Sequence, residues 1–403
     1  MGIGCSVGGG VSLIELADTY GTPLLVYDLN RVEANYRALV DNTGARVYYS
    51  IKANGNLALL RFLRSLGAGA DASSPGEIYL ALRAGFRPGD IMYTGSFLSN
   101  TEIEYGIRAG VTFNFDSIRA FERALGLGYE PRLVFFRVDL GYGRGFTHGV
   151  TLAGEDSKFG MFINDAIEAY RLAKLKGAVE YGIHAMMGSN VLDADYFLKI
   201  ANLLRESARV IEDKVGVKIT HYDMGGGFGI PYKPGEPELD LSKLRGLRGY
   251  FPGELIIEPG RFIVGNAGYL LVRVTEVKRK GRKTYVGVEA GMNILIRPML
   301  YGAYHHMVNC SNPSGDVEVV DVVGPICENT DKLAVDRELA RVREGDLLVI
   351  LNAGAYVYSM SSNYNGRLRP PEVVVYGRNH ALARRGESLE DLVKGQEIPW
   401  FIK

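Results

Sequence analysis

Several short β-rich runs in the first two-thirds of the chain end in side chains that could do chemistry. A lysine, Lys52, closes the first run, and a histidine, His184, closes the sixth. A lysine amine can act as a nucleophile and form a Schiff base with an aldehyde. Acids, a cation and glycine-bearing turns stand at the ends of other runs: Asp71, Arg137, Gly188, Ser189, the turn 225–229 and the segment 258–261.

Each of these features alone has an ordinary structural explanation. A lysine after a strand is most often an exposed surface residue, a glycine triplet is usually a tight turn, and Glu-Pro-Gly-Arg is a plausible loop. Their combination indicates more, because glycine-rich turns with an arginine can hold a phosphate, and a carboxylate can keep a pyridine nitrogen protonated. A phosphate, an aldehyde and a pyridine together describe pyridoxal 5'-phosphate, whereas an enzyme for a phosphorylated sugar would need only the glycines.

The elements that must position these residues alternate between strand-like and helix-like patterns. Residues 56–66 have apolar side chains at helical spacing, Ser99 and Glu102 form a capping box, and 193–215 is long and periodic. Eight strand–helix alternations predict an α/β fold, a closed (β/α)8 barrel, with its active site at the carboxyl ends of the strands. The eight predicted strands are 47–53, 69–72, 90–94, 110–115, 132–139, 179–185, 219–224 and 254–258.

The pattern changes near residue 262, after which strand-like runs follow one another without long helices. These runs are 268–279, 283–288, 316–323, 346–351 and 371–376. They predict a separate, mainly antiparallel all-β domain of the sandwich or barrel type. The first twenty or so residues also read as β-like and could pair with it, since chain termini often lie near each other. The predicted domains are therefore a cofactor-binding barrel over 25–263 and a β domain over 1–24 and 264–403.

Longer motifs resemble a known family. The segments 49–54, 225–227 and 258–261 look like those of the fold-type III pyridoxal-phosphate enzymes, which include alanine racemases and several amino-acid decarboxylases. Further segments resemble the diaminopimelate decarboxylases in particular: 157–160, 297–305, 324–328, 354–356 and 359–365. The resemblance covers roughly residues 20 to 385, and the later motifs are long and specific. It implies decarboxylation of meso-2,6-diaminopimelate to L-lysine, the last step of lysine biosynthesis.

The resemblance also implies roles for residues of the barrel. Lys52 would be the catalytic lysine that forms the Schiff base with the cofactor, and Glu258 would bind the pyridine nitrogen. Ser189 and Gly227 would bind the phosphate and ring. The complete set of cofactor-binding residues that we expect is Lys52, Asp71, Arg137, His184, Ser189, Gly226, Gly227, Glu258, Pro259, Gly260, Arg261 and Tyr356. No metal site is predicted.

The remaining implied roles concern the substrate and the proton. Cys327 would protonate the substrate carbon after carbon dioxide leaves, and it would reach the site from the second subunit of a homodimer. A thiol is a weak acid whose pKa lies near the operating pH, which suits this task. The substrate-binding residues would be Arg261, Arg297 and Tyr301 for the distal carboxylate, with Glu328 for the distal ammonium and Tyr356 beside them.

One position departs from the family pattern. After the sixth strand the family usually has His-x-His-x-Gly-Ser, and the second histidine stacks on the cofactor ring. Here the sequence is His184-Ala185-Met186-Met187-Gly188-Ser189, so Met186 occupies the stacking position. A thioether can pack on an aromatic face, so we expect cofactor binding to survive, while the electronic tuning of the ring and the rate are open.

Other functions within and beyond this chemistry stay possible. A D-ornithine or D-lysine decarboxylase shares most of these motifs. An alanine racemase would carry a tyrosine as second acid/base and lacks the Cys-Glu turn. A pyridoxal-phosphate-binding protein without activity would consist of the barrel alone, and the β domain with Arg297, Cys327 and Tyr356 argues against it.

The composition excludes some partners and predicts a compartment. The 403 residues carry 46 basic and 46 acidic side chains, so a nucleic acid or an acidic membrane surface is not expected as a partner. No apolar run is long enough to cross a membrane, and no secretion signal is visible. The three cysteines argue against a disulfide framework and for a reducing cytoplasm. Cys5 and Cys310 are expected to be small buried apolar residues.

Overall fold

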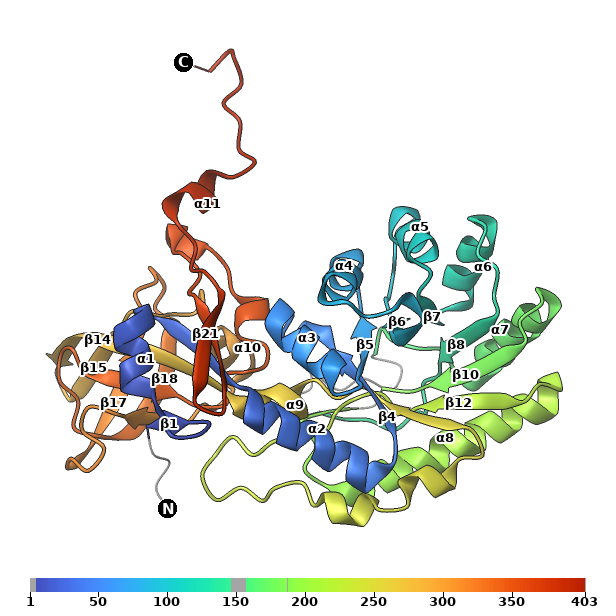
Figure 1. Cartoon of the computed structure of the whole chain (residues 1–403), viewed down its shortest axis with the longest axis horizontal. Coiled ribbons are helices and arrows are strands. Elements are labelled where there is room, and N and C mark those ends of the chain that lie inside the picture. The colour runs from blue at the N-terminus through green and yellow to red at the C-terminus, as the bar shows by residue number, and fades with distance from the viewer. Residues whose placement is uncertain (1–4, 146–156, 187, 403) are drawn as a thin grey trace. The chain divides into compact units, whose positions relative to one another are not determined.

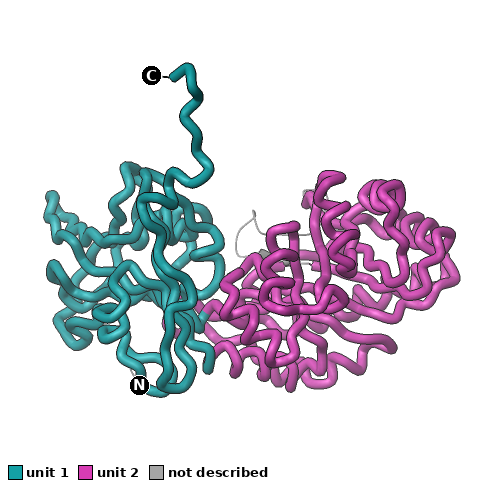
Figure 2. The backbone as a smooth tube through the Cα atoms, turned by 45° about the horizontal axis from the view of Figure 1, so that its top comes forward, with its two compact units in different colours: residues 1–30, 266–403 teal, residues 31–265 magenta. Residues whose placement is uncertain are grey.

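The computed structural model describes residues 5–145, 157–186 and 188–402, and Figure 1 shows the course of the chain. The chain divides into two compact units, coloured separately in Figure 2. Unit 1 comprises residues 1–30 and 266–403, and unit 2 comprises residues 31–265. Each unit has its own sheet.

Unit 2 is a closed barrel of eight parallel strands, as predicted. Neighbouring strands follow the order of the chain, and the last strand pairs with the first, which closes the sheet. The barrel strands are β4 (Arg46–Ser50), β5 (Gly69–Ala72), β6 (Ile91–Tyr93), β7 (Thr112–Phe115), β8 (Leu133–Arg137), β10 (Glu180–His184), β12 (Ile219–Asp223) and β13 (Glu254–Ile257). All eight strands predicted from the sequence are present.

Helices connect these strands and cover the outside of the barrel (Figure 1). These helices are α2 (Leu29–Thr43), α3 (Leu57–Ser65), α4 (Pro75–Ala84), α5 (Asn100–Ala109), α6 (Ile118–Gly126), α7 (Ile163–Leu175) and α8 (Ala194–Val215), and the short α9 (Arg261–Val264) follows the last strand. The predicted capping box of Ser99 and Glu102 opens α5, so both residues satisfy backbone donors at the start of that helix. Asp193 caps α8, which matches the predicted long helix.

The barrel interior is filled with side chains. Tyr48, Met92, Phe135 and Ile256 form a buried cluster inside it. A Cβ atom on Gly182 of β10 would lie 2.2 Å from the ring of Phe135, so only glycine leaves room for that ring. The interior therefore supports the strands from within, and polar residues gather at the strand ends.

Unit 1 is built on a nine-stranded, mainly antiparallel sheet, as predicted for the second domain. Its strands are β3 (Leu24–Asp28), β14 (Gly268–Lys280), β15 (Lys283–Val288), β16 (Met307–Asn309), β17 (Val317–Val323), β18 (Lys332–Ala340), β19 (Leu347–Ile350), β20 (Glu372–Tyr376) and β21 (Asn379–Arg384). Along β14, Leu270 and Val272 belong to one buried cluster and Leu271 belongs to the other. This alternation shows that the sheet buries apolar side chains on both faces.

The start of the chain differs from the predicted β-like segment. Two very short strands, β1 (Ser6–Val7) and β2 (Val11–Ser12), are followed by a helix, α1 (Leu13–Tyr20). Ser12 caps this helix by accepting the N–H of Glu15, and Leu13, Leu16 and Ala17 are buried at helical spacing. β3 then pairs with β14 and β20, so it belongs to the sheet of unit 1 rather than to a barrel that begins at residue 25.

The expectation that Cys5 and Cys310 are unpaired apolar residues is wrong. They form a disulfide across 305 sequence positions, with their Cα atoms 5.6 Å apart. The bond joins the segment before β1 to the end of β16, within the buried cluster that contains Cys310. A count of three cysteines permits one bond and one free thiol, and the exposed Cys327 is the free one.

No helix in the described part of the chain is both long enough and apolar enough for a membrane crossing.

Candidate active site

The predicted barrel residues lie at the carboxyl ends of the barrel strands. Lys52 sits in a short 3₁₀ helix, η1 (Ile51–Ala53), directly after β4, and Asp71 lies in β5. Arg137 ends β8 and His184 ends β10. Glu258 follows β13. A closed parallel barrel brings the ends of all its strands to one rim, which is why residues far apart in the sequence meet there.

Lys52 lies beside a buried carboxylate. Its Nζ atom is 3.9 Å from Oδ2 of Asp71, and its side chain is 46% exposed while that of Asp71 is 2% exposed. The hydroxyl of Ser50 donates to Asp71 at 2.7 Å. Burial raises the pKa of Asp71 to about 7, with help from the negative charge of Glu258, although Lys52 and Ser50 oppose the shift. The amine is therefore accessible and next to a group that can exchange a proton near neutral pH.

Glu258 and His184 form a buried pair. Nε2 of His184 lies 3.0 Å from Oε2 of Glu258, and both side chains are almost fully buried. Burial by itself would raise the pKa of Glu258, but the interaction with His184, together with Lys52 and Arg137, outweighs it and lowers the pKa. Glu258 is therefore ionised, although it is inside the protein.

The second oxygen of Glu258, Oε1, has no hydrogen-bond partner within the described residues. Burying a charged acceptor without a hydrogen-bond donor costs free energy, so an atom of this kind indicates that a ligand supplies the donor. The N–H of a protonated pyridine ring is such a donor. This atom is the feature of the structure that best fits the predicted cofactor.

The turn of three glycines after β12 lies too close to neighbouring backbone for any residue with a side chain. Gly225 and Gly227 have φ angles of +63° and +95°. A Cβ atom on Gly226 would lie 2.5 Å from the carbonyl oxygen of Glu258, and one on Gly227 would lie 2.8 Å from that of Gly188. The three glycines therefore allow close approach of the chain segments that carry the predicted phosphate-binding residues.

Arg261 completes this side of the rim. Its guanidinium donates to the hydroxyl of Tyr232 at 2.7 Å and to that of Ser189 at 3.3 Å. A Cβ atom on Gly260 would lie 2.8 Å from Cβ of Ala53, so the segment 258–261, which includes Pro259, packs against the helical turn that carries Lys52. The backbone near the lysine and the cation near Ser189 are thus held together.

Arg137 and Met186 contact each other at the carboxyl ends of the strands. The guanidinium of Arg137 lies 3.9 Å from a carboxylate oxygen of Asp116 and donates to the carbonyl oxygen of Met186 at 3.4 Å. The thioether of Met186 accepts the N–H of Gly226 at 3.1 Å. Met186 therefore contacts the glycine turn directly, and its stacking on a cofactor ring stays a prediction.

The other predicted residues belong to unit 1. Arg297 opens α10 (Arg297–Tyr301) and Tyr301 ends it. Arg297 is almost fully buried and bonds to Nε2 of His305 at 2.8 Å, while Nδ1 of His305 contacts the carbonyl oxygen of Leu351. Tyr356 has a φ angle of +59°, a conformation that non-glycine residues rarely adopt and that is found often at functional sites.

The turn that carries Cys327 and Glu328 is rigidly held. The carboxylate of Asp331 accepts the N–H groups of Met292 at 2.6 Å and Ile326 at 2.8 Å. A Cβ atom on Gly324 would lie 2.3 Å from that carboxylate, so the turn fits closely around Asp331. Asp331, three residues after Glu328, was not predicted as a site residue.

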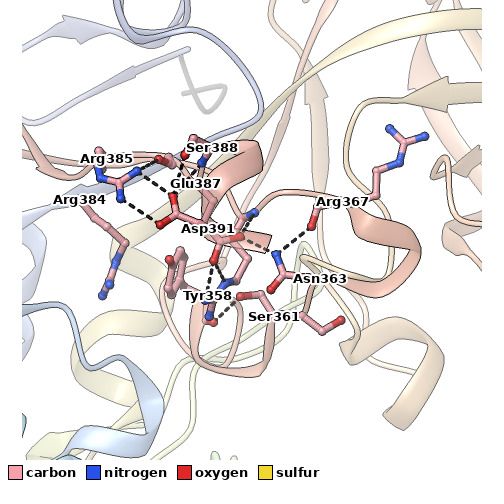
Figure 3. A network of polar contacts seen from close by, with 12 residues as sticks. Tyr358, Ser361, Asn363, Arg367, Arg384, Arg385, Glu387, Ser388 and Asp391 are labelled. Carbon is pink, nitrogen blue, oxygen red and sulfur yellow. Dashed lines mark hydrogen bonds and ion pairs between the residues drawn. The ribbon is translucent and has the colours of Figure 1, made fainter. Parts of the chain in front are cut away.

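A second segment, residues 363–365, also holds this turn. The side chain of Asn365 accepts the N–H of Cys327 at 2.7 Å, and the hydroxyl of Tyr364 donates to Glu328 at 2.7 Å. Figure 3 shows how this segment is anchored: Asn363 donates to the carbonyl oxygen of Arg367 at 3.0 Å and to Glu387 at 2.5 Å. The exposed thiol therefore has a fixed position within unit 1.

Comparisons with known proteins agree with this geometry. Residues 29–265 match the family described as pyridoxal-dependent decarboxylase, pyridoxal binding domain. A diaminopimelate decarboxylase of Methanothermobacter thermautotrophicus is 42% identical over 97% of this chain and 95% of its own length, and one of Archaeoglobus fulgidus is 40% identical over 98% and 97%. The crystal structure of diaminopimelate decarboxylase from Methanocaldococcus jannaschii with L-lysine is 34% identical, covers 97% of this chain and 95% of that one, and has a TM-score of 0.89.

Proposed function

We propose that this chain, which belongs to the family of pyridoxal-dependent decarboxylases, removes one carboxylate of meso-2,6-diaminopimelate and yields L-lysine. The observation that carries the substrate assignment is the near full-length similarity to several relatives that are named diaminopimelate decarboxylases. The observation that supports the cofactor is the buried, ionised Glu258 with its unpartnered oxygen at the barrel rim.

Pyridoxal phosphate, when bound, supplies an aldehyde for the amine and an electron sink for the carbanion that forms when carbon dioxide leaves. Lys52 offers the amine, and its partial exposure allows both the cofactor and the substrate to reach Nζ. Asp71, with a pKa of about 7, can accept or return the proton that this amine must lose before it reacts. Glu258 would hold the pyridine nitrogen protonated.

The phosphate would be bound by Ser189, by the backbone of Gly227 and by the segment 258–261, with Tyr356 contributing from unit 1. These residues fit the group because three chain segments approach closely only through glycines, and Arg261 already contacts the hydroxyl of Ser189. A fixed arginine beside backbone N–H groups is the arrangement that phosphates prefer.

The distal end of diaminopimelate carries both a carboxylate and an ammonium group. We assign the carboxylate to Arg261, Arg297 and Tyr301, and the ammonium to Glu328. The two arginines can each donate two parallel hydrogen bonds to a carboxylate, which a lysine side chain cannot do. Lysine and ornithine lack this carboxylate, so they would leave the arginines without their ligand.

Cys327 would donate the proton that replaces the lost carboxylate. Its thiol is exposed and free, and the turn that carries it is held by Asp331 and Asn365, so its position is defined before substrate arrives. We propose that this thiol serves the barrel of a second copy, in a homodimer with shared sites.

Location in the cytoplasm stays a prediction, which fractionation of the source cells would test.

The decisive assay measures carbon dioxide release from a panel of D- and L-diamino acids under multiple turnover. We expect meso-diaminopimelate to be the preferred substrate, with L-lysine as the product. Preference for D-ornithine or D-lysine would transfer the function to those substrates, and release limited to less than one equivalent would indicate a binding protein.

A further inference from the structure

Asp223, the last residue of β12, is fully buried at the barrel rim and has no part in the chemistry described above. One of its oxygens, Oδ1, accepts the N–H of Gly225 at 2.8 Å. The other, Oδ2, has no hydrogen-bond partner among the described residues, and neither has Oε1 of Glu258. Side-chain atoms of His184, Asp223 and Glu258 lie within 4.8 Å of one another.

The charged groups around Asp223 do not balance three ionised carboxylates. Glu258 follows β13 on one side, His184 ends β10 on the other, and Asp71 faces the same space from β5. The basic side chains beside this space are engaged elsewhere, since His184 pairs with Glu258 at 3.0 Å and Lys52 lies 3.9 Å from Asp71.

Two further cations stand at the rim: Arg137 lies 3.9 Å from Asp116, and Arg261 donates to the hydroxyls of Tyr232 and Ser189. No ion pair joins Asp223 to a cation in the described part of the chain. A carboxylate buried without a cation avoids the cost of its charge by keeping its proton.

We propose that Asp223 is a positioning residue that keeps its proton and donates it in a hydrogen bond to Glu258. This bond would satisfy Oδ2 of Asp223 and one of the two lone pairs of Oε1 of Glu258, which leaves the second lone pair of Oε1 for the N–H of the pyridine ring. It would also share the negative charge of Glu258 without cancelling it, so Glu258 stays an ionised acceptor for the pyridine nitrogen. The proton on Asp223 is a property of the chain itself, and only its catalytic consequence rests on the proposed function.

The charge distribution agrees with this arrangement. Burial raises the pKa of Asp223 well above its ordinary value, and the negative charges of Glu258 and Asp71 raise it further, against the opposing bond from Gly225. The pKa of Glu258 is lowered instead. Two neighbouring carboxyl groups whose pKa values are driven apart take separate roles, one as the acid and one as the anion.

The first test reads the proton directly. The infrared difference spectrum between full-length wild-type holoenzyme and D223N at neutral pH should contain the carbonyl stretch of a protonated carboxylic acid, which shifts in D2O. D116N is the matched control, because Asp116 is a buried carboxylate of the same unit but lies beside Arg137. Absence of the band from the D223N difference spectrum, or its presence with D116N, would overturn the proposal.

The same proton predicts how stability depends on pH. The folded-state pKa of Asp223 is raised above the unfolded value of about 3.9, so its contribution to stability is lost as the pH rises. The unfolding constant of the wild type, relative to that of D223N, should therefore increase about tenfold per pH unit from roughly pH 5 up to the raised pKa of the folded state. A flat ratio between pH 6 and 8 would mean that Asp223 is ionised. A divalent ion retained in stoichiometric amount after dialysis would also overturn the assignment.

A second set of variants separates positioning from simple structural support. D223N retains an oxygen for Gly225 and an N–H donor for Glu258, whereas D223A loses both. We expect D223A to shift the absorption spectrum of the bound cofactor and to lower kcat at least tenfold, and D223N to recover most of both. Equal damage by the two variants with an unchanged cofactor spectrum would show that Asp223 only supports the turn. Failure of the decarboxylase assay with the wild type would overturn the proposed function, but not the proton on Asp223.

Discussion

Replacing Glu258 with glutamine tests the centre of the proposed mechanism. The substitution keeps the shape of the side chain and removes its charge. Glu258 is 4% exposed, lies 3.0 Å from Nε2 of His184, and carries an oxygen without a partner in the described residues. A glutamine amide can still bond to His184, but it cannot hold a pyridine nitrogen protonated.

The size of the effect follows from the type of bond that is lost. A hydrogen bond to a charged group contributes about 1.5–3 kcal/mol, and each 1.4 kcal/mol corresponds to about a tenfold change. This hydrogen bond strengthens as charge develops on the cofactor ring in the transition state. Its loss should therefore lower kcat by about ten- to hundredfold and change KM less.

The same substitution should move the pH–rate profile in a known direction. Burial and the charge of Glu258 raise the pKa of Asp71 to about 7. Removing that charge removes part of the raising influence, so the pKa of Asp71 should fall. Any inflection that Asp71 contributes near pH 7 should therefore move to lower pH in E258Q.

The matched control is E254Q, on the same strand. Glu254 is partly exposed and lies near Arg46 and His221 at the opposite end of β13, so it shares the chemistry of the substitution but not the site. Carbon dioxide release and the absorption spectrum of the bound cofactor should change in E258Q alone. A kcat of E258Q within twofold of the wild type would refute the role of Glu258, and equal losses in both variants would mean that the strand, not the charge, matters.

Four further predictions follow from the structure. Borohydride reduction of the holoenzyme should place the pyridoxyl label on Lys52 by peptide mapping, K52A should lose both label and activity, and a label on another lysine would move the assignment. Mixed K52A and C327A subunits should regain part of the activity if two copies share a site, and no recovery after demonstrated subunit exchange would mean that they do not. Loss of the Cys5–Cys310 bond in C310S should lower the free energy of unfolding by about 2–4 kcal/mol in urea titration, as reductant should in the wild type, while C327S should not. Replacing Arg297 by alanine should reduce kcat/KM for meso-diaminopimelate by at least tenfold and that for D-lysine far less, whereas equal losses would show that Arg297 does not read the distal carboxylate.

Sequence reasoning located the barrel because its signals are local. Most barrel strands are short β-rich runs between turn residues. The helices have apolar side chains at helical spacing and often a cap such as Ser99. The rule that barrel chemistry lies at strand ends then brought Lys52, Asp71, Arg137 and His184 together without any distance information. The structure adds the pairings: Asp71 with Lys52, and His184 with Glu258.

The features that sequence reasoning missed depend on contacts between distant segments. Cys5 and Cys310 are 305 positions apart, and nothing in their neighbouring residues marks them as partners. The helix after Ser12 was not predicted because a short segment with mixed apolar residues does not distinguish a helix from a strand. The structure identifies it by the cap at Ser12 and by the buried face of Leu13, Leu16 and Ala17. Each of these outcomes is decided by what the segment packs against.

Asp223 shows why a strand-end rule finds positions but not charge states. It closes the seventh barrel strand in the same way that His184 closes the sixth, so the rule applies to it as well. The protonation state of Asp223 depends on Glu258, which follows the neighbouring strand β13. The sequence does not show that β12 and β13 are neighbours until the barrel is assembled. Ionising both buried carboxyl groups without an ion-pair partner for Asp223 would cost much free energy. One of the two therefore keeps its proton. Asp223 is the acid and Glu258 the anion because β12 and β13 are adjacent strands. A variant that removes either carboxyl group should therefore change the pKa of the other.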